Sequence, residues 1–199
     1  GACDIVERIF RVCRQRLWRG RTSRTSKINV VMDERNYATL RIAALLHDIG
    51  HLPFSHDMEE IIYSNTMIKR IIKRDFPECD PKPHEVLSYY VVNSRYFQDL
   101  LSEIERKFDI QIDKDIIGDL IVAKLPRGDL NRAWMASIIN GIIDVDKLDY
   151  LRRDSYYTGV AYGVIDSSAV IRGIEKIGRH IRIKRDYLPA YESLLIGRY

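Results

Sequence analysis

The sequence predicts a mostly α-helical fold, and three features of the chain support this prediction. Apolar residues recur at helical spacing in one segment after another along most of the chain. The breaks between these segments are short and contain Gly, Pro or residues with capping side chains, as is typical of helix boundaries. Alternation of apolar and polar residues with period 2 is evident only in His180–Arg185, so at most a short β-hairpin is expected near the C-terminus.

The first quarter of the chain contains two helical patterns separated by a basic segment. The first pattern covers Cys3–Trp18 and the second covers residues 34–48. Between them, Arg19–Lys27 is rich in Ser, Thr and Gly; a solvated connector is the simpler interpretation, and a phosphate-binding loop is the alternative. Gly50 is well placed to end the second helix. The positions that share one face of that helix, at i, i+3, i+4 and i+7, are Leu40, Ala43, Ala44 and His47.

Helical patterns continue through the rest of the chain with short breaks. Further helices are expected at 56–74, 84–94, 96–108, 113–124, 130–140, 144–156 and 167–177. Three of them have a capping side chain at or near their first residue, namely Asp113, Asn131 and Asp166.

Length and composition indicate one globular domain over residues 1–199, with one domain plus a small appendage as the alternative. Hydrophobic residues make up 46% of the chain and charged residues 30%, which is far from the composition of disordered chains. Three widely spaced cysteines without a CxxC pair favour a reducing, cytoplasmic environment over a disulfide framework. No apolar run is long enough for a transmembrane helix, so no membrane partner is expected. The net charge of +4 favours anionic partners in general; a nucleic acid is compatible with it but is not specifically indicated.

The most informative stretch is Ala43–His56, with the sequence AALLHDIGHLPFSH. His47 and Asp48 are adjacent at the end of an otherwise apolar helix, and His51 and His56 follow closely. Neutral imidazoles together with a carboxylate suit Fe, Mn, Zn or Co, and the carboxylate also accepts Mg. Adjacent residues of a helix point about 100° apart, so this pair can share one ion only where the helix ends. A lone His is usually a core or surface residue, but three His and an Asp so close together favour a site for a divalent metal ion.

A second polar stretch, Asn140–Gly159, has the sequence NGIIDVDKLDYLRRDSYYTG. The residues that share or border one helical face are Asp146, Lys147, Tyr150, Arg153 and Asp154. One carboxylate beside a Lys and a Tyr could complete a metal site and hold a phosphate. Taken alone, the pattern is more typical of a salt-bridged surface helix, so its interpretation depends on the first stretch.

Together, the two stretches resemble the HD-domain deoxynucleoside triphosphate triphosphohydrolases and their uncharacterised relatives. The resemblance rests on HD followed by IGHLPFSH, then a His-Glu pair at His84, then DVDKLDYLRRD, and it extends in order from Ala2 to the closing ESLLIGRY. The HD dipeptide alone is weak, whereas the longer motifs in this order are specific. The resemblance implies an HD-domain helical bundle and a metal-dependent phosphohydrolase of the HD superfamily.

The resemblance also implies a metal site built from distant parts of the chain. His47 and Asp48 would be paired ligands, and Asp146 would be the distant carboxylate that closes the site. The helices over 34–48 and 144–156 are therefore expected to pack together, with the Asp146 carboxylate near His47 and Asp48. The ion would be divalent, with Fe, Mn, Zn, Co and Mg all compatible with these ligands.

The remaining roles implied by the resemblance concern the substrate. His51 and His84 would be catalytic or transition-state-stabilising groups near the scissile phosphate. Without the resemblance, the simpler interpretation of His84 is a histidine at a helix N-terminus in contact with solvent. Residues implied to line the pocket or bind substrate are His56 in the pocket, Lys147 and Tyr150 on the phosphates, Asp154 on the sugar 3′-hydroxyl, and Arg198 on a phosphate.

One departure from the family's pattern concerns the start of the chain. The pattern opens with an Arg and a His in a segment such as RFxHSLG, and that His is the first metal ligand. No His precedes His47 in this chain, and Gly1–Asp4 resemble the residues that come just after that segment in the family. At the other end, Arg198–Tyr199 resemble the middle of a family helix that continues further. The chain is therefore expected to be a fragment, truncated at both ends, of a longer protein that supplies the first His. Separately, the protein is expected to form a homo-oligomer. Weak metal binding is expected for the fragment alone.

Three functions remain open from the sequence. The first is hydrolysis of a deoxynucleoside triphosphate to the nucleoside and inorganic triphosphate. The second is a phosphomonoesterase or phosphodiesterase acting on another nucleotide. The third is a non-catalytic module for nucleotide binding or oligomerisation that retains the fold. Tyr150 and Asp154 favour the first over the second, because they match the positions that recognise phosphate and sugar in the resembled family.

Overall fold

Helices dominate the structure, as predicted. The computed structural model describes residues 1–19, 33–124, 133–141, 144–160, 164–177 and 180–197. Its helices are α1 (Ala2–Arg19), α2 (Glu34–Leu46), α3 (His56–Ser64), α4 (Thr66–Asp75), α5 (Pro83–Val92), α6 (Arg95–Phe108), α7 (Lys114–Ile121), α8 (Ala133–Asn140), α9 (Val145–Thr158), α10 (Ser167–Gly173) and α11 (Leu188–Ile196), with a 3-10 turn, η3, at Arg185–Tyr187. The β structure of the described residues is one antiparallel hairpin near the C-terminus, β1 (Ile174–Ile177) with β2 (His180–Ile183), in which Ile174 faces Ile183. The predicted fold class is confirmed.

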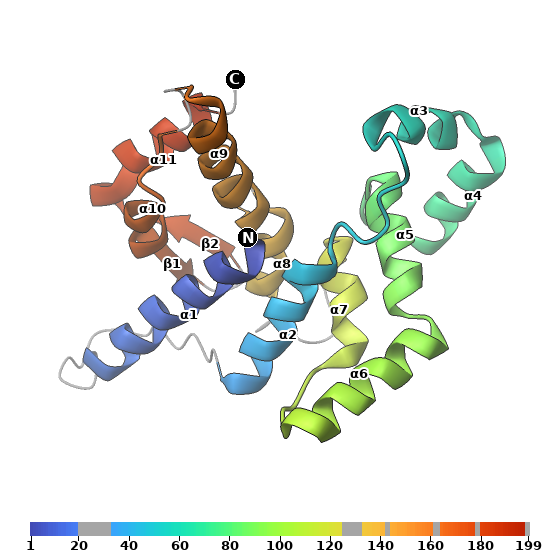
Figure 1. Ribbon diagram of the computed structural model, residues 1–199, viewed down its shortest axis with the longest axis horizontal. Helices are drawn as coiled ribbons and strands as arrows, with labels where there is room; N and C mark the ends of the chain where they lie inside the picture. The colour runs from blue at the N-terminus through green and yellow to red at the C-terminus, as the bar shows by residue number, and fades with distance from the viewer. Residues whose placement is uncertain (20–32, 125–132, 142–143, 161–163, 178–179, 198–199) are drawn as a thin grey trace.

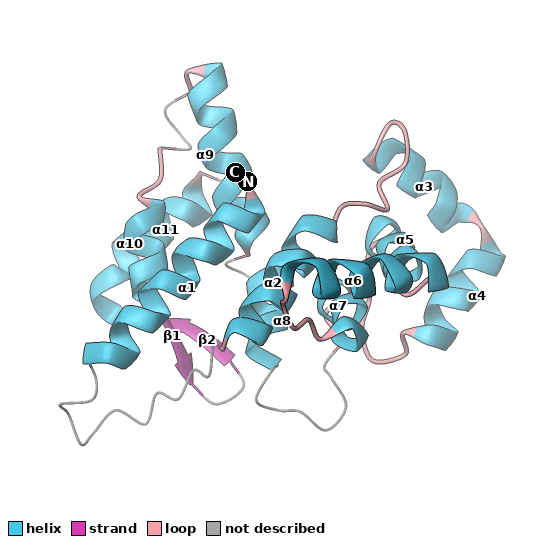
Figure 2. Cartoon of the chain, turned by 60° about the horizontal axis from the view of Figure 1, so that its bottom comes forward, coloured by secondary structure: helices cyan, strands magenta, loops and turns pink. Residues whose placement is uncertain are grey.

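The helices form two groups that meet at α2 and α8. Figure 1 shows α1, α9, α10, α11 and the hairpin on one side and α3 to α7 on the other. The turned view in Figure 2 places the hairpin at the edge of the first group, beside α1 and α10. Helix α1 packs against α2 and α9, whereas α7 packs against α2, α5 and α8. This arrangement brings the end of α2 next to the beginning of α9, although about a hundred residues separate them in sequence.

Two hydrophobic clusters support this arrangement. The main one joins α1, α2, α7, α8 and α9, and α8 (AWMASIIN) is buried on nearly every side because almost all its residues are apolar. A smaller cluster of Ile72, Phe76, Val86 and Val122 holds α4 against α5 and the end of α7. None of the helices in the described ranges combines the length and the apolar character that crossing a membrane requires.

The predicted helix over 56–74 is wrong in one respect, because it is two helices. Helix α3 ends at Ser64 and α4 begins at Thr66, with Asn65 between them. The Asn65 side chain accepts hydrogen bonds from the backbone N–H groups of Met67 and Ile68, at 2.9 and 3.3 Å. An Asn that caps a new helix stops the preceding one, which the apolar spacing did not reveal.

Several other boundaries also differ from the prediction. The last residues of the predicted helix over 167–177 form β1, because their backbone pairs with β2. Asp166 caps α10 as predicted, by accepting from Ala169 N at 2.8 Å. Asp113 precedes α7 but makes no capping bond; its carboxylate lies 3.5 Å from Arg35 instead.

Helix α11, which contains Pro189 in its first turn, was not among the helices predicted from apolar spacing. The resemblance implied a helix around Arg198–Tyr199, and these two residues lie outside the described part of the chain. The predicted cap Asn131 and residues 20–27 of the basic segment lie outside the described residues.

Candidate metal centre

The HD pair lies in a turn immediately after α2. The helix begins at the cap Asp33, whose carboxylate accepts from Asn36 N at 2.7 Å, and it ends at Leu46 rather than at residue 48 as predicted. His47 and Asp48 are therefore outside the regular helix, where adjacent side chains can converge. The His47 Nε2 atom lies 3.2 Å from Asp48 Oδ2. This is the local geometry that sharing one ion requires.

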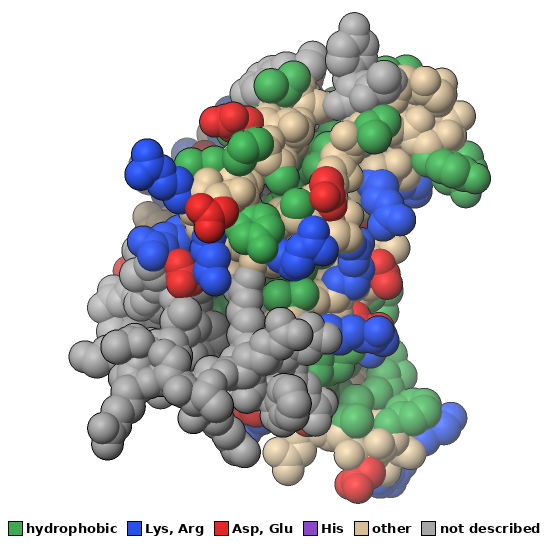
Figure 3. All heavy atoms as spheres, turned by 90° about the vertical axis from the view of Figure 1, so that its left-hand side faces the viewer, with side chains coloured by type: hydrophobic (Ala, Val, Ile, Leu, Met, Phe, Trp, Pro, Cys, Tyr) green, Lys and Arg blue, Asp and Glu red, His purple; other side chains and the backbone are tan. Residues whose placement is uncertain are grey.

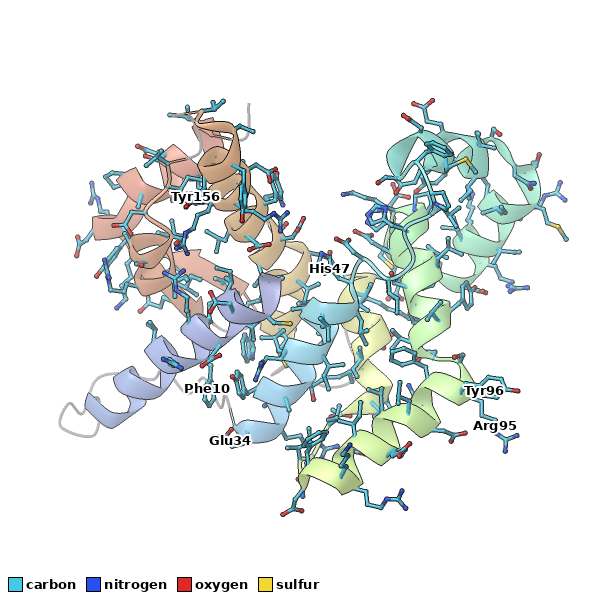
Figure 4. The ribbon with its side chains drawn as sticks, in the orientation of Figure 1. Phe10, Glu34, His47, Arg95, Tyr96 and Tyr156 are labelled. Atoms are coloured by element: carbon cyan, nitrogen blue, oxygen red, sulfur yellow. The ribbon has the colours of Figure 1, made fainter. Side chains whose placement is uncertain are left out.

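Asp146 reaches the same place from the first turn of α9. Asp144 starts this helix by accepting a hydrogen bond from Lys147 N at 2.7 Å, which places Asp146 at the helix start. The Asp146 Oδ1 atom lies 3.8 Å from His47 Nε2, so the expected meeting of the two segments is confirmed. One ligand atom from each of His47, Asp48 and Asp146 lies within 4.8 Å of the others. Figure 4 shows His47 at the end of α2, between α9 and α5.

The surroundings of His47 fit a cation. Its Nδ1 lies 2.9 Å from the Ala44 carbonyl oxygen, so a neutral imidazole donates there and keeps its lone pair on Nε2. Nε2 is buried and has no hydrogen-bond partner. Burial acts to lower the pKa of His47, but the contacts with Asp146 and Asp48 outweigh it and raise the pKa to about 10. The field at Nε2 thus favours a positive charge, which a divalent ion held by imidazole and carboxylates would provide.

A second group of side chains lies beside the first and shares Asp48. His51 Nε2 is 3.5 Å from Asp48 Oδ1, and the His51 and His84 rings stack with centroids 3.9 Å apart and an interplanar angle of 19°. Glu59 Oε1 lies 2.5 Å from His84 Nδ1 and 3.6 Å from His51 Nδ1. Burial lowers the pKa of His84, although the contact with Glu59 acts in the opposite direction. Four elements therefore contribute to one polar cluster: the turn after α2, α3, α5 and α9.

Gly50 and Ser88 hold the HD turn against α5. The Ser88 hydroxyl accepts a hydrogen bond from Gly50 N at 2.9 Å and donates to the His47 carbonyl oxygen at 2.7 Å. A Cβ on Gly50 would lie 2.3 Å from the His84 carbonyl oxygen and 2.4 Å from Ser88 N. Glycine is needed here for this close approach and not, as the sequence suggested, to end α2.

The chain leaves the turn through a strained segment. Phe54 and Ser55 both have positive φ, 65° and 47°, which is uncommon for residues with a side chain. This backbone reverses the chain into α3, and α3 carries Glu59 back to the imidazoles. Ser55 Oγ itself lies 3.2 Å from His51 Nδ1. Strain of this kind is typically maintained at functional sites.

The predicted substrate residues lie mainly on α9, and their roles remain predictions. The Lys147 ammonium pairs with Asp144 and donates to the Gly141 carbonyl oxygen at 3.2 Å. Tyr150 is half-buried against the main cluster, and Asp154 is exposed, with Arg153 Nε 3.6 Å from its carboxylate. Arg198 and the side chain of His56, which begins α3, lie outside what the structure describes.

Cavities are also present on another part of α9. Two of them, of about 470 and 550 Å³, lie between α1, α9 and the residues preceding α10, and Arg152 lines both. Neither includes a residue of the metal cluster. On the side of α10 and α11, basic and acidic side chains are interspersed, and no histidine of the described part is visible (Figure 3). Imidazoles and carboxylates converge instead at the cluster around the HD turn.

Two residues of the site were missed in the sequence. Glu59 contacts both imidazoles, and Ser88 fixes the HD turn. Helical spacing provides a signal for each: Glu59 is three residues after His56, and Ser88 is four residues after His84.

The family of the chain follows from its sequence. A model of the HD domain matches residues 21–154, which include the HD turn, α3, α5 and the first part of α9. The chain belongs to the HD domain family.

Known relatives are longer than this chain. It is 30% identical over 172 residues to an uncharacterized protein of Mycoplasma genitalium, covering 84% of this chain and 37% of the relative. It is 35% identical over 130 residues to the deoxynucleoside triphosphate triphosphohydrolase SAMHD1 homolog of Dictyostelium discoideum, covering 63% of this chain and 22% of that protein. A phosphohydrolase structure from Bacteroides thetaiotaomicron has the same fold, with a TM-score of 0.62, 21% identity, and coverage of all of this chain and 38% of the other.

Proposed function

We propose that the protein is a metal-dependent phosphohydrolase acting on nucleotides, and that it converts deoxynucleoside triphosphates to nucleoside and inorganic triphosphate. The observation that carries this proposal is the cluster of His47, Asp48 and Asp146 around a buried nitrogen without a hydrogen-bond partner. Membership of the HD domain family supports the metal-dependent hydrolysis. The name of the Dictyostelium relative supports the choice of substrate.

The order of residues along α9 also supports this substrate. Asp146 at the helix start lies in the metal cluster, Tyr150 is one turn further on, and Asp154 is one turn beyond Tyr150. A substrate extending along α9 from the cluster would place its phosphates by Lys147 and Tyr150 and its sugar by Asp154. A bare phosphomonoester has no group to reach Asp154.

The contribution of the chain's own residues can be stated for this reaction. A bound divalent ion would polarise a phosphoryl oxygen and lower the pKa of a water. Asp48 and Asp146 hold the negative charge that retains the ion, and the Ala44 carbonyl fixes the tautomer of His47. The Lys147 ammonium, kept at the start of α9 by Asp144, would offset charge on the phosphates. The catalytic roles of His51 and His84 that the resemblance implies remain predictions.

The test is a product analysis with the full-length, metal-loaded protein. Each deoxynucleoside triphosphate is incubated with it, and nucleoside, mono- and diphosphate products are separated together with the inorganic products. Nucleoside and triphosphate are expected from at least one of them. Pyrophosphate with monophosphate, or activity on monophosphates alone, would identify another nucleotide phosphohydrolase. A metal-loaded protein that turns over no nucleotide would be a binding module.

Asp154→Ala is expected to reduce kcat/KM for the deoxynucleotide about ten- to a hundredfold. The reason is the loss of a hydrogen bond to the sugar hydroxyl, worth about 1–3 kcal/mol. Steady-state kinetics measure the effect, and the bound metal should stay constant because Asp154 is not in the cluster. Equal loss with a substrate lacking the 3′-hydroxyl would contradict the assigned contact.

A further inference from the structure

One buried hydroxyl of α5 closes the HD turn. Ser88 Oγ accepts a hydrogen bond from Gly50 N at 2.9 Å and donates one to the His47 carbonyl oxygen at 2.7 Å. A single side chain therefore bonds the first residue of the turn and the residue three positions later. Ser88 is 0% exposed, so solvent does not reach either bond.

The turn has two backbone hydrogen bonds of its own, and they leave these two groups aside. Ile49 N donates to the Leu46 carbonyl oxygen and His51 N donates to the Asp48 carbonyl oxygen, both at 3.1 Å. The His47 carbonyl and the Gly50 N–H are bonded to Ser88 instead. The shape of the turn therefore depends on a contact with α5 as well as on its own residues.

This shape decides where two side chains of the metal cluster point. His47 and Asp48 follow the last residue of α2, so the regular helix does not set their directions. His47 Nε2 lies 3.2 Å from Asp48 Oδ2 and 3.8 Å from Asp146 Oδ1. A site of this kind works only when its groups are held within about 0.5 Å of the required geometry. The backbone that carries two of the three groups is held by Ser88.

The same hydroxyl links the turn to the imidazole pair. Ser88 is four residues after His84, so both side chains lie on one face of α5. The His84 ring stacks on His51, with centroids 3.9 Å apart. Gly50 permits the short bonds, because a Cβ there would lie 2.3 Å from the His84 carbonyl oxygen. Ser88 thus fixes the distance between the HD turn and the helix that carries His84.

We propose that Ser88 is a positioning residue of the metal centre, whose hydroxyl fixes the HD turn so that His47 and Asp48 meet Asp146 at one ion. It acts through the backbone and is not itself a ligand. The inference rests on the proposed function only in that the cluster binds a divalent ion. Without the hydroxyl the turn keeps its two local bonds, so the ligand geometry loosens while the domain stays folded. Ion affinity then falls about 10- to 100-fold, the usual effect of losing a group that orients ligands.

The test compares wild type and Ser88→Ala in the full-length protein by Mn²⁺ titration calorimetry and by thermal unfolding without metal. Ser88→Ala should bind Mn²⁺ about 10- to 100-fold more weakly than the wild type. Its Tm should also fall, because the buried Gly50 N–H and His47 carbonyl are left without their partner.

Thr39→Val is the matched control, because Thr39 has the same kind of buried hydroxyl away from the cluster. Thr39 is 0% exposed, and its Oγ1 accepts from Asp113 N at 2.8 Å and donates to the Arg35 carbonyl oxygen at 2.7 Å. This bridge joins α2 to the start of α7, and none of its residues belongs to the metal cluster. Thr39→Val should lower Tm as Ser88→Ala does and keep the wild-type affinity for Mn²⁺.

Two further variants test whether the hydroxyl itself matters. Ser88→Thr keeps the hydroxyl and should bind Mn²⁺ more tightly than Ser88→Ala, although its extra methyl group costs stability. Ser88→Cys serves if Ser88→Ala does not fold. Its thiol is a weak donor and a weak acceptor, so its affinity for Mn²⁺ should also be below that of the wild type.

Wild-type affinity for Mn²⁺ in Ser88→Ala, or an equal loss of affinity in Thr39→Val, would overturn the inference and leave the metal centre standing. Weaker Mn²⁺ binding in Ser88→Ala alone, in a protein whose wild type hydrolyses no nucleotide, would overturn the proposed function and leave the role of Ser88 standing.

Discussion

Asp146→Asn in the full-length protein is expected to remove about one bound metal ion per chain and to lower kcat/KM by roughly a thousandfold or more. Asp146 is the residue of the first cluster that comes from α9, with its carboxylate 3.8 Å from His47 Nε2, and we expect it to be a ligand of the ion. An amide keeps the shape but loses the charge that retains the ion. The ion's stabilisation of the transition state is worth several kcal/mol, and each 1.4 kcal/mol is about tenfold in rate. Elemental analysis and steady-state kinetics measure the two effects.

Asp149→Asn is the matched control for Asp146→Asn. It makes the same change in charge one turn further along α9, where Asp149 pairs with Arg153 at 2.6 Å and takes no part in the metal cluster. Its metal content should equal that of the wild type. If Asp146→Asn also has the metal content of the wild type, Asp146 is not a metal ligand. The proposal that one ion is bound by residues of both the α2 turn and α9 would then be wrong.

Gly50→Ala is expected to have the second large effect, on stability and on the metal site together. The added Cβ would lie 2.3 and 2.4 Å from two backbone atoms of α5 and 2.8 Å from Leu87 Cβ. Backbone cannot rotate away, so α5 must move, and it carries His84. Overpacking of this kind costs about 3 kcal/mol, which lowers Tm by roughly 10 °C in a chain of this size. Thermal unfolding and Mn²⁺ titration measure the two consequences.

Gly159→Ala is the control that separates the effect of backbone strain from the effect of the steric clash expected in Gly50→Ala. At Gly159 an added Cβ meets no atom within 4 Å, and only the positive φ of 71° is unfavourable. A cost of about 1 kcal/mol is expected, with unchanged metal affinity. Similar losses of metal affinity in both variants would show that Gly50 does not act through its contact with α5.

Apolar spacing predicted most helices because most of them have one buried face, whose apolar residues repeat every three to four positions. Apolar spacing gave the wrong secondary structure where a hydrogen-bond partner outside the segment determines the backbone conformation. Asn65 divides the helix predicted over 56–74 by capping α4, and residues 174–177 become a strand because β2 lies beside them. In both places the apolar pattern alone is compatible with a longer helix.

The sequence by itself determined the fold class and identified the HD pair as a candidate metal site, because the spacing and chemistry of neighbouring residues are local properties. The role of Asp146 came from the resemblance to the HD-domain phosphohydrolases. Tertiary structure alone decided that α2 ends before His47, that Gly50 touches α5, and that Glu59 lies behind two stacked imidazoles. These features depend on contacts between elements far apart in the chain, chiefly the packing of α3 and α5 against the turn. Asp48 shows the difference. It is next to His47 in the sequence, but its Oδ1 atom lies 3.5 Å from His51 Nε2 because the chain after the turn folds back through α3 and α5.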